Sequence, residues 1–179
     1  MPQAAAPHDA TGGDAHGADA TLADRAGAQA SAEASAAEEH AFQQAFRGSF
    51  TSALRWHHLD ALWAVLRADA DGGWYLYAVG EPPPEAPASA EQVHRFIDEM
   101  DALLRREHDE DYCGIVYADD LKAPALVKIY DPNNLGVVCG FSDSPPLPGW
   151  VMSKLKPVDL PAAQPAPKGR RRWWQRLFG

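Results

Sequence analysis

Two cysteines, Cys113 and Cys139, are the residues best suited to redox or metal chemistry. Each stands beside a glycine in a short apolar segment, so they form either a reactive thiol pair or two small apolar side chains in a core. Zinc sites need closely spaced ligands such as C-x-x-C, which the sequence lacks. His57 or His58, with Asp60 nearby, could act as a base for Cys113. We expect no metal, cofactor or catalytic residue, and keep a small enzyme or a metal- or thiol-handling accessory protein, using both cysteines and a histidine, as the alternative.

Polar and acidic residues also mark several predicted loops. Acidic residues in the ranges 108–112 and 117–120 bracket a predicted strand, where carboxylates hold magnesium or a basic partner, or keep a loop solvated. Asp131, Asn133 and Asn134 stand in a turn that either presents oxygens to a ligand or only connects two strands. A phosphate-binding glycine loop is absent from the sequence, so nucleotide binding has no local support.

The last twelve residues, 168–179, concentrate cations and aromatic side chains. The chain has a net charge of −9, and because this tail contributes +5, the residues before it carry −14. In a helix, the apolar side chains of the tail fall within an arc of about 140°, with most of the cations on the other side. The candidate binding residues are Arg170, Arg171, Arg172, Trp173, Trp174, Arg176, Leu177 and Phe178.

Three uses of such a tail are open. Tryptophan and arginine suit an anionic membrane surface, where the rings lie at the headgroups and the cations contact phosphates. The same residue types anchor peptides in partner proteins. The third use is docking on the acidic body of the chain itself. The acidic body argues against nucleic acid as a partner, since binding to a duplex needs a cationic surface.

The closing residues Arg176, Leu177, Phe178 and Gly179, with the cations before them, resemble the short C-terminal membrane-targeting helix of the Min-system ATPases. The likeness covers only this end of the chain, and the nucleotide-binding loop of those ATPases has no counterpart here. The resemblance therefore implies reversible membrane docking for these residues and does not extend to the ATPase activity.

Composition divides the rest of the chain into three parts. Residues 1–40 carry almost no apolar side chain larger than alanine, which predicts a disordered arm, because little surface can be buried. The arm lacks the basic start and apolar stretch of a signal peptide, so we expect a cytoplasmic protein. Residues 41–160 have the apolar patterns of a globular domain, and the Pro- and Ala-rich residues 161–167 are typical of a linker.

The domain is predicted to be α+β, in the order α-β-α-β-β-β. Phe42, Phe46 and Phe50, followed by an apolar pattern as far as Leu66, predict an amphipathic helix interrupted near Gly48. A second helix begins at an S-x-x-Q capping box in the range 89–92. Strands are predicted at 74–79, 112–117, 125–130 and 136–141, the last three as an antiparallel meander. The prolines after residue 143 predict an extended segment that does not pair.

These patterns together favour a non-enzymatic adaptor or accessory module. We expect its acidic domain to bind a protein partner, still unknown. Its tail would dock reversibly on a complex or on the inner face of the cytoplasmic membrane.

Overall fold

The computed structural model describes residues 17–135, 146–160 and 168–178 of the chain. It shows an α+β protein, and within these ranges the α-helices are α1 (Gly17–Phe46), α2 (Trp56–Ala68), α3 (Ala90–Glu107) and α4 (Lys168–Phe178). The strands are β1 (Thr51–Ser52), β2 (Tyr75–Ala78), β3 (Val116–Ala118), β4 (Leu126–Ile129) and β5 (Trp150–Ser153). The chain divides into two compact units, Met1–Ala37 and Glu38–Gly179.

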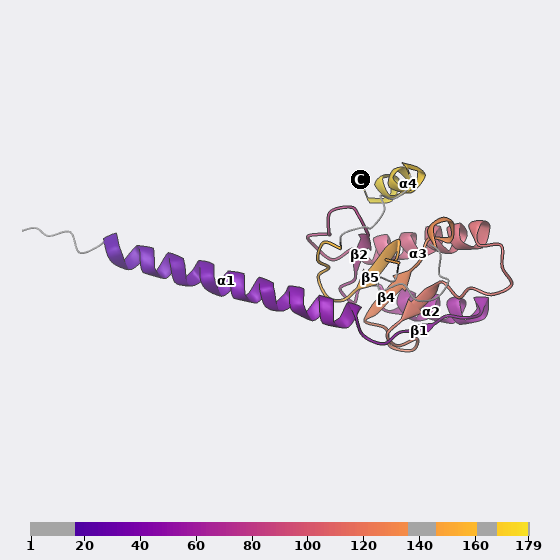
Figure 1. The fold of residues 1–179 in the computed structure, drawn as a ribbon, viewed down its shortest axis with the longest axis horizontal. Helices are drawn as coiled ribbons and strands as arrows, with labels where there is room; N and C mark the ends of the chain where they lie inside the picture. The colour runs from indigo at the N-terminus through magenta and orange to yellow at the C-terminus, as the bar shows by residue number, and fades with distance from the viewer. Residues whose placement is uncertain (1–16, 136–145, 161–167, 179) are drawn as a thin grey trace, which may run out of the picture. The chain divides into compact units, whose positions relative to one another are not determined.

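The strands form one antiparallel sheet in the order β1-β3-β4-β5-β2. Consecutive strands β3, β4 and β5 pair as a meander, in which Val116 faces Ile129 and Ile129 faces Trp150. β2 then pairs with the outer side of β5. Figure 1 shows α2 and α3 lying side by side against one face of this sheet.

Side chains alternate between the two faces of the sheet, as a pleated strand requires. On β5, Trp150 and Met152 join the core under the helices, whereas Val151 joins a smaller core on the opposite face. On β2, Leu76 and Tyr77 divide in the same way. The sheet is therefore buried on both sides.

Helix α3 begins where the capping box predicts it. The Ser89 Oγ accepts a hydrogen bond from the backbone N–H of Gln92 at 3.2 Å, and the Gln92 side chain accepts one from the Ser89 N–H at 2.8 Å. Together these bonds satisfy two N–H groups that a helix start leaves without partners. The apolar face of α3 is buried as expected, and its members are Val93, Phe96, Ile97, Met100, Leu103 and Leu104.

Helix α1 ends at Phe46, so the predicted interruption near Gly48 separates two helices. Lys128 holds this end, because its ammonium donates a hydrogen bond to the Phe46 carbonyl at 2.6 Å. The same ammonium lies 4.0 Å from the centre of the Phe46 ring and 3.8 Å from that of Phe50. Burial lowers the pKa of Lys128 to about 8. The carbonyl and the two ring faces stabilise the protonated form.

One part of the sequence-based interpretation was wrong. The segment after the prolines was expected to run unpaired, but Trp150–Ser153 forms β5, hydrogen-bonded to both β4 and β2. The physical reason is local: no proline occurs between Pro148 and Pro157, so the four residues of β5 keep every backbone N–H. The strand predicted at 136–141 lies outside the described residues.

The N-terminal arm was predicted to be disordered over residues 1–40. Residues 1–16 lie outside the described residues, and residues 17–40 lie within helix α1. This part of the chain buries little surface, as predicted, because every residue from Arg25 to His40 is exposed. Alanine is the best helix former, so a segment that buries nothing can still be helical through the intrinsic preference of its residues.

Candidate functional site

Helix α4 packs on the globular domain by its aromatic face. Trp173 is 8% exposed and Leu177 is 6% exposed, and both belong to the core beneath α2 and α3. Trp174 and Phe178 are partly buried against the same core. The tail predicted to bind a membrane, a partner or the body of the chain therefore contacts its own body in this structure.

Arg170 anchors the start of α4 through two carboxylates. Its guanidinium donates to Asp131 at 2.7 Å from Nε and 2.8 Å from Nη2, a bidentate arrangement. It also donates to Glu107, from Nη1 at 3.2 Å and from Nη2. The side chains of Arg170, Glu107 and Asp131 are 13%, 21% and 6% exposed. This ion cluster is mostly excluded from solvent, so its geometry matters more than that of a surface pair.

The rings of α4 contact rings of the domain. Trp173 meets Trp150 on β5 edge to face, with centroids 5.6 Å apart. Trp174 meets Phe96 on α3 in the same manner at 6.1 Å. Phe178 lies 6.3 Å from Phe96, measured between ring centroids. Edge-to-face pairs of this kind add to the free energy gained by burial, which makes the aromatic contact specific in direction.

Two further polar contacts join α4 to the domain. Arg171 pairs with Glu81 at 2.7 Å, and the Arg95 side chain donates to the Arg176 carbonyl at 3.4 Å. We call Glu81, Phe96, Glu107, Asp131 and Trp150 the α4 docking surface. The exposed side of α4 carries Arg171, Arg172, Gln175 and Arg176.

The ion cluster sets the charge state of its members. Hydrogen bonding by Arg170 lowers the pKa of Glu107 to about 2, so this carboxylate is ionised at neutral pH. Hydrogen bonds to Asp131 and Glu107 raise the pKa of Arg170 above its usual value. One permanent cation thus stands between two carboxylates, and Arg106 pairs with Glu107 as well, at 2.8 Å.

The turn predicted as a ligand site is part of this cluster. Asp131 caps the 3₁₀-helix Pro132–Asn134 by accepting from the Asn133 N–H at 2.9 Å, and it also binds Arg170. The Asn133 amide donates to Glu107 at 2.6 Å. Asn134 lies at the end of the 3₁₀-helix. The structure therefore brings two separately predicted sites together, the polar turn and the basic tail.

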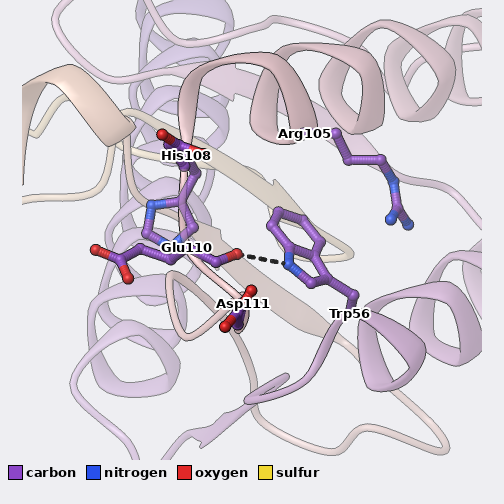
Figure 2. A pocket seen from close by; sticks show the side chains of 6 residues that line it. Trp56, Arg105, His108, Glu110 and Asp111 are labelled. Carbon is purple, nitrogen blue, oxygen red and sulfur yellow. Dashed lines mark hydrogen bonds between the residues drawn. The ribbon is translucent and has the colours of Figure 1, made fainter.

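The acidic loop after α3 borders a shallow pocket of about 310 Å³. Figure 2 shows the Trp56 indole between the side chains of Arg105 and His108, donating to the Glu110 carbonyl at 3.0 Å. Arg105 lies 5.0 Å from the centre of that indole. The Nε2 atom of His108 is buried and has no hydrogen-bond partner among the residues described. The loop at 117–120 has a structural role, since Asp119 accepts from N–H groups that begin β4.

The thiol and metal interpretation gains little support. Cys113 is fully buried, and burial raises the pKa of its thiol, which disfavours the reactive thiolate. Cys139 lies outside the described residues. The His57 and His58 rings meet edge to face, with centroids 4.3 Å apart, and His58 accepts from the Arg55 N–H at the start of α2. In the described ranges, no three His, Cys, Asp or Glu side chains gather in a way that could hold a metal ion.

On the domain side of the site, the sequence predicted only the turn that contains Asp131. Phe96, Glu107 and Trp150 were not among the candidate binding residues. Their partners in α4 are far along the chain, as for Arg170 and Glu107, which are 63 positions apart. The excess of acidic charge before residue 168 was the signal available, and it indicated a basic ligand without locating its site.

Comparison with known proteins adds no relative. No family model, no curated protein and no solved structure matches the chain. A search of the described helices finds none that is both long enough and apolar enough to span a membrane. The geometry of the α4 contact is therefore the basis for a functional proposal.

Proposed function

We propose that the protein is a non-enzymatic cytoplasmic adaptor with two positions for α4. In the closed position α4 lies on the α4 docking surface. In the open position it lies on an anionic membrane surface, while the domain holds a protein partner. The observation that carries the proposal is that Trp173, Leu177 and Arg170, the residue types a membrane helix needs, are the ones that the closed position buries or pairs.

The two positions compete for the same side chains. An amphipathic helix binds lipid by burying its apolar face among the headgroups, and this face is against the domain in the closed position. The exposed side of α4 still presents Arg172 and Arg176. Closed molecules could therefore approach an anionic surface electrostatically before α4 turns over.

The free energies that favour the closed and the open position of α4 are similar in size. Each cation near an anionic membrane contributes on the order of 1 kcal/mol, and burial of a large apolar side chain contributes about 1.5–3 kcal/mol. The closed position offers burial of similar side chains and an ion cluster. An isolated helix of this length is marginal in water, so a surface must support it in either position. Small changes on the domain side should shift the balance.

The test changes the domain and leaves α4 intact. Asp131→Asn keeps an oxygen to cap the 3₁₀-helix but removes a charge that holds Arg170. We expect about tenfold stronger binding to vesicles of equal parts phosphatidylglycerol and phosphatidylcholine, corresponding to about 1.4 kcal/mol. Sedimentation with the vesicles measures it. Glu85→Gln is the matched control, because it removes one negative charge from a side chain that pairs with Lys156 rather than with a cation of α4.

Two changes in α4 complete the test. Trp174→Glu should abolish vesicle binding even at low salt, because it places a charge in the apolar face, whereas Arg172→Gln should only weaken it. Binding should also fall with added salt, since exposed charges are screened within about 10 Å at 0.1 M. If neither the natural chain nor Asp131→Asn binds anionic vesicles at low salt, the membrane part of the proposal is wrong.

A further inference from the structure

The α4 docking surface has the properties of a receptor for a helix. We propose that, once α4 leaves, this surface binds an amphipathic helix of a partner protein, with arginine, an aromatic residue and leucine at the spacing of Arg170, Trp173 and Leu177. In this interpretation α4 is a tethered competitor of the partner helix. The inference identifies the partner site of the adaptor proposed above, and it rests on that proposal only in requiring that α4 can leave.

The contact depends almost entirely on side chains of α4. Its anchors stand at i, i+3, i+4, i+7 and i+8, which is the pattern by which amphipathic helices bind apolar surfaces. A backbone contact occurs at the end of the helix, where Arg95 reaches the Arg176 carbonyl. Any helix can offer such a carbonyl. A different chain with the same anchors could therefore make the same contacts.

Charge complementarity selects the partner. Asp131 and Glu107 both bind one guanidinium, and the bidentate geometry at Asp131 fits arginine better than lysine. When α4 leaves, Glu107 keeps its pair with Arg106, but Asp131 loses the bidentate guanidinium while lying on an acidic domain. A replacement arginine would restore the lost hydrogen bonds, and the surrounding negative charge would attract a basic helix.

The aromatic rings of the α4 docking surface further restrict which helix can bind. Trp150 presents a ring to the position three residues after the arginine, and Phe96 presents one to the rings four and eight residues after it. Leu177, 6% exposed, fills the position seven residues after the arginine. A helix with arginine but small residues at these places would leave Trp150 and Phe96 uncovered. The partner class is therefore basic and aromatic.

Tethering explains how binding would be controlled. A segment joined by a short linker acts at an effective concentration on the order of millimolar. A free partner helix competes poorly against such a tethered segment. Any event that removes α4 strengthens partner binding, and by linkage the partner favours release of α4 to the same degree.

The experiment opens the surface in the full chain. Arg170→Glu places a third carboxylate beside Asp131 and Glu107 and should release α4 without lipid. The probe is a fluorescent peptide with the natural sequence of residues 168–179, followed by fluorescence anisotropy. We expect it to bind Arg170→Glu at least about tenfold more tightly than the natural chain, whose own α4 competes. Leu177→Glu, which releases α4 from its other end, is a second variant that should give the same result.

Two further probes test the chemistry. Adding Asp131→Asn to Arg170→Glu should weaken peptide binding about tenfold, because one charged partner of the arginine is lost. A second peptide, built from alanine and glutamine with only the arginine, aromatic and leucine anchors at the same spacing, should bind as well. Its counterpart with glutamate in place of the arginine should not bind.

The outcomes separate this inference from the membrane proposal. If the folded release variants bind neither peptide, or bind them equally with and without Asp131→Asn, the inference is wrong. If the release variants instead pair with the natural chain into dimers that exclude the peptide, the occupant is the tail of a second copy and the partner proposal is overturned. Peptide binding without any vesicle binding by Asp131→Asn would support the inference and reject the membrane position of α4.

Discussion

The helices α1 and α4 stand near the two ends of the chain and are helical for different reasons. α1 has 30 residues, rich in alanine, and its residues from Arg25 to His40 are exposed. α4 has 11 residues with bulky rings and cations, and Trp173 and Leu177 are buried. The first is supported by intrinsic preference and the second by packing and ion pairs. Length is therefore a poor guide to which helix carries specific contacts.

The comparison predicts that α1 matters to the fold only at its C-terminal end. Phe42 is fully buried in the smaller core, where its ring stacks on Phe46 at 5.8 Å. Phe42→Ala should lower the free energy of unfolding by about 3–5 kcal/mol, the largest effect expected here, because it leaves a cavity. Urea denaturation measures it. Ala36→Gly, in the exposed part of the same helix, is the control and should cost about 1 kcal/mol of local helix stability without moving the main transition.

The buried face of α4 should come next in size. Trp173→Ala removes the ring that meets Trp150, and we expect a loss of about 2–3 kcal/mol, less than for a central core residue because α4 can detach. Hydrogen exchange followed by mass spectrometry should show faster exchange throughout α4, with the sheet unchanged. Gln175→Ala, on the exposed side, should leave exchange as it is. Equal exchange in both variants would mean that packing does not hold α4.

Sequence patterns predicted elements better than they predicted the contacts between them. The capping box at Ser89 and the apolar face of α3 follow from local rules, and both are confirmed. β5 was not predicted because prolines occur close to it in the sequence. Its four residues nevertheless all have a backbone N–H that can pair in a sheet. The ion cluster could not be predicted, because Arg170 and Glu107 meet only once the chain is folded. Tertiary neighbours so far apart leave no local pattern.

Acid should release α4, since the closed position depends on ionised Glu107. The pKa of this group is about 2, below the ordinary value of 4.5, chiefly because of the hydrogen bonds from Arg170 and secondly because of Arg106. A lowered pKa means that the stabilisation is complete above pH 4.5 and is lost as the pH falls from there towards 2. Tryptophan fluorescence should report undocking in this window, an effect of about 1–2 kcal/mol for a partly exposed group. Glu107→Gln should remove this contribution, and an unchanged profile in that variant would contradict the assignment.

The smallest effect on stability should come from deleting most of α1. Removing residues 1–37 eliminates the exposed part of α1 but keeps Phe42 and the end of the helix that Lys128 holds. Because every residue from Arg25 to Ala37 is exposed, little apolar burial is lost, and the melting temperature should change by no more than about 1 °C. Circular dichroism should show lower helix content with the same thermal midpoint. A fall of several degrees would show that the arm contributes to the stability of the domain, and the contrast between α1 and α4 would then be wrong.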